Sequence, residues 1–395
     1  MSRATLYQYF SSKEQLFVEL IRTAAADLLR VIQRLGAIGP TVEGYDNLHW
    51  WLGEWAWVQD KYTALYLQWA VTDSPEASLR PLIAEHIVSY VSSLTPRLSA
   101  AIDDDFDASG VATVLLPLLF RMNDYRQKGM TRTLTDEEVL DGTATFVQLA
   151  LFPSTTRSAL AARTTAPRAP RPGRVRRASE ATRERSERAP IPATVQRILH
   201  AGAETFAARG FHHSTVQDVL QCARVGRGTF YKYFDDKTDL LISLAEDCMF
   251  RLEELAGCFV DAIDADDSGR TLREWLQECL TLHRQYQGVF RALLHEESRH
   301  PVLEDLRRQS GGAILRIFDR ALARVDRAYP FDVRVGSLLL LALLERGPEY
   351  AFGTDYDLSE ARVVEVLAVL IERGLLDRTP PRSLRRPPRP DLVAS

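Results

Sequence analysis

The chain has 395 residues, of which 46% are hydrophobic, and a formal net charge of −4. This length exceeds what one compact core usually uses, so we expect two or three domains. No apolar run reaches the roughly 18 residues of a membrane span, and no export signal opens the chain, so we expect a cytoplasmic protein without membrane contact.

The first recognisable element is a short string, RATLYQYFSSK, over residues 3–13. It returns 224 residues later as RGTFYKYFDDK, over residues 227–237. Other pairs keep this offset to within one residue: Leu16 with Leu240, Trp51 with Trp275, Tyr62 with Tyr286, and Tyr125 with Tyr350. A register kept over more than a hundred positions predicts two copies of one helical module.

Five of the six Trp residues lie between residues 50 and 69, in the helical stretch over residues 21–152 that follows. An aromatic helix face suits a flat or cationic effector, although ordinary core packing is the alternative interpretation. Trp51 has an equivalent in Trp275 and is assigned to the core. The predicted ligand-binding residues are Trp55, Tyr62, Tyr66 and Trp69.

Residues 153–191 separate the two copies and contain ten Arg and three Glu, with many Ala, Pro, Ser and Thr residues. Such a composition buries too little apolar surface to fold, so we predict a disordered linker. We give the same prediction for the tail, residues 379–395. The basic charge lies in these segments, so any DNA contact by the folded halves is local.

The second copy is the more complete one. A helical period ends at Gly210, Ser214 and Thr215 offer an N-cap for the next helix, and the repeated string forms a third, short helix. Its inner face consists of Phe230 and Phe234. Counterparts of residues 192–224 are absent from the first copy, so we expect its true start to lie upstream of residue 1.

The rest of the second copy also has helical period, over about 271–298, 301–326, 332–352 and 359–375. In the first copy the corresponding last two helices are predicted at about 109–128 and 135–152. No alternating strand pattern occurs in the sequence. The predicted fold class is all-α.

Residues 192–242 resemble the N-terminal domain of the tetracycline-repressor (TetR) family of transcriptional regulators. The residues that match its pattern are Gly210, Phe211, Thr215, Val216, Ala223, Val225, Gly228, Thr229, Phe230, Tyr231, Tyr233, Phe234 and Lys237. Residues 2–20 resemble the family's third and fourth helices, through Ser2, Arg3, Thr5, Leu6, Tyr7, Tyr9, Phe10 and Lys13. The turn departs from the pattern, with Arg224 in place of Gly and Gly226 in place of a Ser cap, so we expect strain at Arg224.

The resemblance implies two helix-turn-helix heads, a partial one over residues 1–20 and a complete one over 192–242. Each precedes a helical ligand-binding and dimerisation domain, over 21–152 and 243–378. Family members dimerise through the last two helices of that domain. Because one chain holds both pairs, we expect an intrachain pseudo-dimer, with an ordinary homodimer as the alternative.

DNA contact is predicted for the outward face of the recognition helix and for Lys237, placed to neutralise a phosphate. These residues are Thr215, Arg227, Thr229, Tyr231, Lys232, Tyr233 and Lys237. In the first copy we expect the same contacts from Arg3, Thr5, Tyr7, Tyr9 and Lys13, on the condition that its true start lies upstream. No catalytic, metal-binding or cofactor motif is found, so we expect neither an enzyme nor a metalloprotein.

The predicted function is a ligand-responsive regulator of transcription, a repressor. Its expected partners are a double-stranded DNA operator and a small apolar or aromatic effector. Two alternatives remain open: a chain with one working head whose front half only dimerises or senses, and a small-molecule sensor that has lost DNA binding.

Overall fold

The computed structural model describes residues 10, 12–65, 79–102, 106–131, 133–161, 192–265, 267–294, 300–325, 332–353 and 358–378. The regular secondary structure within these ranges is helical, and no strand occurs among them. The all-α fold class is therefore confirmed. The chain divides into two compact units, one formed by residues 1–167, 261–277 and 321–395, the other by 168–260 and 278–320.

The first unit contains the helices of the front half. They are α2 (Lys13–Gln33), α3 (Val42–Lys61), α5 (Leu79–Ser99), α6 (Ala108–Gln127), α7 (Asp136–Leu151) and α8 (Arg157–Ala161). Side chains fix several of their starts, and α7 has a full capping box between Thr135 and Glu138. The start of α6 is held by Asp107, whose carboxylate accepts the backbone N–H of Gly110 at 3.0 Å.

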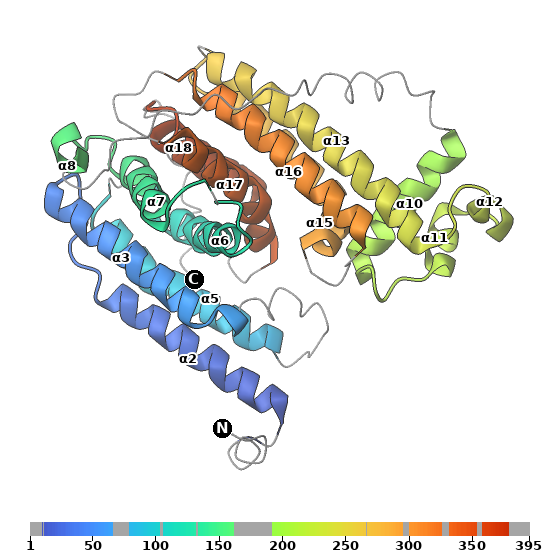
Figure 1. Ribbon diagram of the computed structural model, residues 1–395, viewed down its shortest axis with the longest axis horizontal. Coiled ribbons are helices and arrows are strands. Elements are labelled where there is room, and N and C mark those ends of the chain that lie inside the picture. Colours follow the sequence, from blue (N-terminus) through green and yellow to red (C-terminus); the bar gives the residue numbers. More distant parts are fainter. Residues whose placement is uncertain are drawn as a thin grey trace, which may run out of the picture. The chain divides into compact units, whose positions relative to one another are not determined.

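The same unit also contains the last two helices of the chain, α17 (Val333–Gly353) and α18 (Glu360–Gly374). They pack against α6 and α7, and Figure 1 shows the four helices side by side. The central parts of α6 and α18 are buried around most of their circumference. A helix that is apolar on all sides needs neighbours on all sides, and this bundle supplies them.

Polar contacts also join the two helix pairs of this bundle. The Arg121 side chain, 4% exposed, donates from Nε to Glu345 Oε2 at 2.6 Å, and the Tyr125 hydroxyl donates to the same oxygen at 2.7 Å. At the other end, Arg362 Nη2 donates to Asp107 Oδ1 at 2.7 Å. Residues more than 200 positions apart are thus held together by charge-assisted hydrogen bonds.

The Asp107 carboxylate predicts a pH dependence for the bundle. Burial opposes its ionisation, but the hydrogen bonds from Arg362 and from the Gly110 backbone outweigh burial and lower its pKa below the ordinary value. A lowered folded-state pKa stabilises the fold above the unfolded-state pKa of about 3.9, and that contribution is lost as the pH falls.

We therefore expect Asp107→Asn to destabilise the bundle at pH 7 by about 0.5–1 kcal/mol, a modest value because both partners are about one third exposed. Denaturant unfolding of the two proteins from pH 7 to pH 3 checks this. The stability difference should shrink as the pH drops below about 4, toward the lowered folded-state pKa of Asp107. A difference that stays constant would mean that the charge of Asp107 contributes nothing.

The remaining helices lie wholly or partly in the second unit. They are α10 (Ala193–Arg209), α11 (Val216–Ala223), α12 (Arg227–Tyr231), α13 (Lys237–Asp264), α14 (Arg270–Gln285), α15 (Gln287–Leu294) and α16 (Pro301–Leu322). The ends of α13 and α16 and the first half of α14 belong to the first unit. The single helix expected over 271–298 is divided at Tyr286 into α14 and α15, and α15 packs on α10.

The structure differs from expectation at the start of the linker. Residues 153–161 are ordered: α8 packs on α3, Ala159 and Leu160 are buried, and the Gln148 amide donates to Thr155 Oγ1 at 2.9 Å. These few apolar and hydroxyl side chains pack against the first unit, and the Arg-rich composition begins only after them. The other residues of the predicted linker, 162–191, lie outside the described ranges, as does the tail from 379. Among the helices of the described residues, none has the length and apolarity to cross a bilayer.

Candidate nucleic-acid interface

The candidate interface consists of α10, α11 and α12 and the start of α13. Helix α10 ends at Gly210, which has a φ of 75°. Helix α11 begins with a capping box, in which Thr215 Oγ1 accepts the Asp218 N–H at 3.2 Å and the Thr215 N–H donates to the Asp218 carboxylate at 2.9 Å. These local bonds fix the loop and the direction of α11, so the predicted capping role of Thr215 is confirmed.

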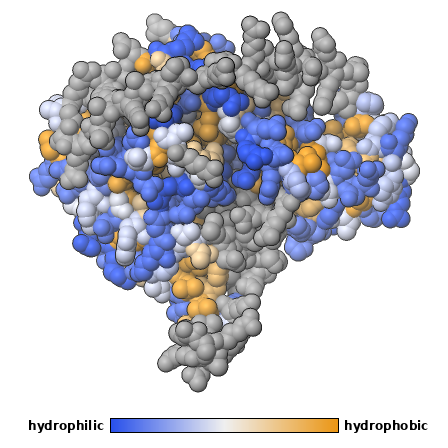
Figure 2. Space-filling view, in the orientation of Figure 1, coloured by the Kyte–Doolittle hydropathy of each residue, from blue (hydrophilic) through white to orange (hydrophobic). Residues whose placement is uncertain are grey.

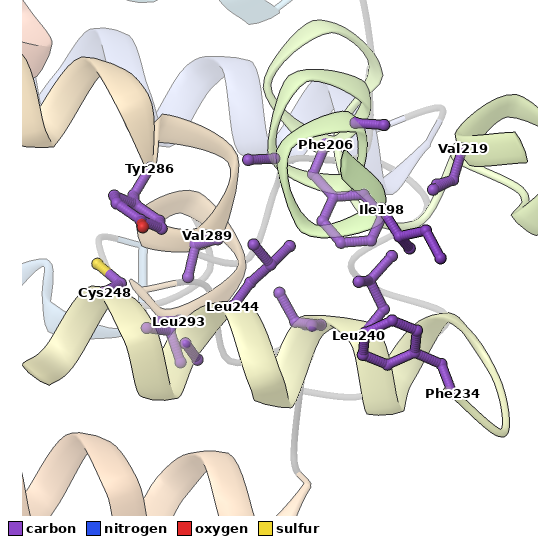
Figure 3. Close-up of a cluster of buried hydrophobic side chains, with 14 of the residues drawn as sticks. Ile198, Phe206, Val219, Phe234, Leu240, Leu244, Cys248, Tyr286, Val289 and Leu293 are labelled. Atoms are coloured by element: carbon purple, nitrogen blue, oxygen red, sulfur yellow. The ribbon is translucent and has the colours of Figure 1, made fainter. Parts of the chain in front are cut away.

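An apolar core holds α12, the predicted recognition helix, in place. Phe230 is fully buried and Phe234 is 5% exposed, with ring centroids 5.5 Å apart. Figure 3 shows Phe234 and Leu240 directed toward Ile198 and Phe206 of α10. The predicted inner face of the recognition helix is therefore confirmed. Packing, and not helix propensity, stabilises a helix as short as α12.

The turn between α11 and α12 has the conformation expected from its sequence. Arg224 adopts the left-handed region with φ 53° and ψ 47°, and Gly226 caps α12 without a side-chain hydrogen bond. A residue with a β-carbon in this region costs roughly 1–2 kcal/mol relative to the right-handed one. The turn thus stores strain at Arg224, directly before the recognition helix.

We expect Arg224→Gly to relieve part of this strain, with a gain of up to about 1 kcal/mol. Arg224→Ala is the matched control, because it removes the same charge but keeps a β-carbon. Thermal unfolding of the second unit, followed by hydrogen exchange in α11 and α12, compares them. Equal stability of the Gly and Ala variants would show that the turn is not strained.

The outward face of α12 carries the predicted contact residues. Arg227, Tyr231 and Lys232 are exposed, while Thr229 and Tyr233 are half-buried. The Lys232 ammonium lies 5.4 Å from the centroid of the Tyr233 ring. Tyr231 is 49% exposed, one of few large apolar side chains so exposed in the described residues. Figure 2 shows that blue hydrophilic residues predominate among the coloured residues on the visible side of the molecule. This surface combines two cations with an exposed ring, a set suited to phosphates and base edges.

The structure gives Lys237 a different position from the one expected. Its ammonium donates to the backbone carbonyls of Phe211, His212 and Ser214 at 2.9, 3.3 and 3.0 Å. An ammonium has three donors, and all three are used here. Burial lowers the pKa of Lys237 from its ordinary value, partly offset by Asp236. Lys237 therefore fastens the loop between α10 and α11. Backbone acceptors leave no trace in a sequence, so this role could not be predicted.

The counterparts in the first copy are not placed. Arg3, Thr5, Tyr7 and Tyr9 lie outside the described residues. Lys13 begins α2, after Ser12 as N-cap. The first recognition helix therefore remains a prediction.

The predicted ligand-binding residues are only partly described. Trp55 is 2% exposed, and its ring meets Phe120 edge to face at 5.1 Å. The Tyr62 hydroxyl donates to Asp27 Oδ2 at 2.7 Å, so Tyr62 is held in a polar contact. Tyr66 and Trp69 lie outside the described residues.

A neighbour of Trp55 on α3 was missed by the sequence analysis. Gln59 is 1% exposed, and its side-chain amide has no hydrogen-bond partner among the described residues. The same holds for the indole N–H of Trp55, one helical turn earlier. Buried polar groups are ordinarily hydrogen-bonded, so these two groups indicate a place where a polar atom of a ligand or a water belongs. A lone Gln in an aromatic helix gives no signal in the sequence. Within the described residues no group of His, Cys, Asp and Glu is arranged to hold a metal.

The fold and the interface define an all-α protein with a helix-turn-helix domain. Residues 198–244 match the family model described as bacterial regulatory proteins, tetR family. The resemblance seen in the sequence is thus supported over this domain. The match covers α10 from residue 198 onward, all of α11 and α12, and the start of α13.

Two curated proteins are similar to part of the chain. The fatty acid metabolism regulator protein of Bacillus subtilis is 33% identical over 88 residues, which is 22% of this chain and 42% of that protein. The transcriptional regulator AcuR of Cereibacter sphaeroides is 34% identical over 80 residues, 20% of this chain and 32% of that protein. The chain thus matches less than half the length of either relative. Both are regulators and neither is named as an enzyme.

A solved structure also matches. It is the transcriptional regulator FadR from Bacillus subtilis in complex with stearoyl-CoA, with a TM-score of 0.36 and 20% sequence identity, covering 47% of this chain and 99% of that one.

Proposed function

We propose that the protein is a ligand-responsive regulator of transcription that binds double-stranded DNA through α12, in the cytoplasm, and represses. The observation that carries the proposal is the geometry of α12: Phe230 and Phe234 are buried in the core while Arg227, Tyr231 and Lys232 are exposed. A recognition helix needs this division between a packed face and a polar face. The family match over residues 198–244 supports the same reading.

The DNA contacts are assigned by side-chain position. Arg227 and Lys232 are cations free to reach phosphates or guanine edges, and Tyr231 supplies a flat ring. Thr229 and Tyr233, at the edge of the same face, complete the surface. Thr215 contributes by capping α11, and Lys237 positions the loop before it. Arg3, Thr5, Tyr7, Tyr9 and Lys13 are proposed as the equivalent contact residues of the first copy.

We further propose that the two halves act as an intrachain pseudo-dimer. Two things support it: α6 and α7 pack against α17 and α18, and these pairs occupy equivalent positions in the two sequence copies. In a symmetric dimer each helix of one partner meets its counterpart or its neighbour in the other, and this bundle has that pattern. Two unlike recognition helices would then read a non-palindromic operator.

The effector is proposed to bind in the helical front domain, beside Trp55 and Gln59. The buried indole N–H of Trp55 and the buried side-chain amide of Gln59 have no hydrogen-bond partner among the described residues, and they offer a donor and a donor–acceptor pair to a ligand. An apolar or aromatic molecule with one polar group fits this chemistry. Binding would lower DNA affinity by favouring one spacing of the two heads.

The test is DNA binding by the full chain. Duplexes are selected from a random library, and affinity is titrated over a range of salt concentrations. Arg227→Ala and Tyr231→Ala should each weaken binding roughly 10-fold to 100-fold, and only Arg227→Ala should reduce the salt slope, by about one. The control Arg320→Ala removes an exposed cation of α16, outside the helix-turn-helix, and should change neither.

The outcomes separate the alternatives. Absence of any selected duplex would favour the sensor that has lost DNA binding. Selection of a palindrome by a two-chain complex would favour one working head per chain. A single chain that binds an asymmetric site would agree with the pseudo-dimer.

A further inference from the structure

The four-helix interface of α6, α7, α17 and α18 contains three glycines in close contact with large side chains. A β-carbon added to Gly142 would lie 2.6 Å from Val335 Cγ1, and one added to Gly110 would lie 2.7 Å from Val366 Cγ2. One added to Gly374 would lie 2.6 Å from the ring of Phe146. Each glycine belongs to one half of the chain and the large residue to the other.

The first two contacts are the same contact seen from opposite sides. The offset of 225 that relates Tyr125 to Tyr350 makes Val335 the counterpart of Gly110. The offset of 224, which also relates the caps Thr135 and Ser359, makes Val366 the counterpart of Gly142. Both places thus combine a glycine of the front half with a valine of the second half. This is the reciprocity of an isologous interface, but with unlike residues on the two sides.

Two copies of the same half would not fit each other at the Gly142–Val335 and Gly110–Val366 contacts. Two second halves would set Val335 against Val366 twice, where the structure leaves no room for a second branched side chain. Two front halves would set Gly110 against Gly142 and leave voids. Overpacking and cavities both destabilise a core. The size complementarity therefore exists only between a front half and a second half.

At the third contact the sizes are reversed, because the glycine, Gly374, belongs to the second half and the large residue, Phe146, to the front half. Gly374 corresponds to Ala150, and Phe146 corresponds to Leu370. Two front halves would place the larger Phe146 against the larger Ala150, which overpacks the site. Two second halves would place Leu370 against Gly374 and leave space. Each like pairing thus meets at least one clash and one void.

The charged residues of the interface also disfavour the pairing of two front halves. Arg121 is buried and finds Glu345 across the interface, but the counterpart of Glu345 in the front half is Phe120. Two front halves would bury each Arg121 with only Asp124 of its own helix as carboxylate partner. Arg362, which binds Asp107, corresponds to Glu138, so two front halves would also bring Asp107 near a carboxylate. Removing one partner of a buried ion pair is strongly destabilising.

We propose that this interface is a selective one: its glycines, valines and charges admit the front half with the second half of the chain and reject two like halves. The partner that fits α6 and α7 is α17 and α18 of the same chain, in place of a second copy. The proposal rests on the proposed intrachain pairing and is independent of DNA binding. It explains how a duplicated dimerisation surface avoids pairing with itself in other chains.

The test is a size exchange in the full chain. Gly142→Val and Val335→Gly should each lower the Tm of the bundle by roughly 3–10 °C or more, through overpacking and through a cavity. The double variant Gly142→Val/Val335→Gly exchanges large and small residues and should recover at least half of the summed loss. Gly311→Val, in α16 where an added β-carbon meets nothing within 4 Å, is the control and should not lower the Tm in this way.

If the Tm losses of the two single variants simply add in the double variant, the proposal is overturned. If Gly142→Val does not fold, the milder set Gly142→Ala, Val335→Ala and their combination carries the same comparison. Sedimentation gives the second readout: the wild-type chain should keep the mass of one chain from low to high concentration. A stable mass of two chains would overturn intrachain pairing, whereas a failed exchange in a monomeric, DNA-binding chain would leave the proposed function standing and remove only the selectivity.

Discussion

Replacing Phe230 with alanine is expected to unfold the helix-turn-helix domain locally and to abolish DNA binding. Phe230 is fully buried among the residues of α10, α11 and α13. Deleting a buried phenyl ring costs about 3–5 kcal/mol, through lost transfer energy and the cavity left behind. Because α12 is five residues long, it has no other source of stability. Amide hydrogen exchange in α10 to α12 should rise at least about 100-fold.

Tyr231→Ala is the matched control in the neighbouring position. It removes an aromatic ring of similar size, but one that is half exposed. Its amide exchange should stay as in the wild type while DNA affinity falls. The two variants thus lose DNA binding for different reasons, one through folding and one through contact. Wild-type protection in Phe230→Ala would contradict the assignment of Phe230 to the core.

The helix-turn-helix was predictable because its determinants are local. Gly210 ends a helix, Thr215 caps the next and Phe230 and Phe234 are four residues apart, and each of these signals acts within a few positions. Even the strained conformation of Arg224 follows from a turn that requires positive φ. Local propensity and tertiary packing agree here, so a sequence pattern suffices.

Elsewhere tertiary contacts decided the outcome. The predicted helix over 271–298 breaks at Tyr286, where a β-carbon on Gly288 would lie 2.4 Å from the Phe206 backbone of α10. The helical period continues through that point, so periodicity alone could not show the break. The buried amide of Gln59 and the unlike packing of Gly142 and Val335 also depend on which helices meet. None of these contacts lies within reach of a local pattern.

Removing the ammonium of Lys237 is the second substitution for which we expect a large effect on DNA binding. Lys237→Met keeps the aliphatic chain and removes the ammonium that binds three loop carbonyls. Hydrogen bonds to a charged group contribute about 1.5–3 kcal/mol each when buried, and less where water replaces the donor, as in this half-exposed loop. We expect a displaced loop, faster amide exchange over residues 211–214 and a DNA affinity reduced roughly 10-fold or more.

The salt dependence separates this positioning role from a phosphate contact. A lysine that neutralises a phosphate contributes about 0.9 to the slope of log affinity against log salt, whereas a lysine engaged with carbonyls contributes almost nothing. Lys232→Met, the same substitution at an exposed ammonium on α12, should flatten the slope by about one and leave the exchange of residues 211–214 unchanged. If Lys237→Met flattens the slope by the same amount, its ammonium leaves the loop for a phosphate when DNA binds, and the loop must then be held by the DNA itself.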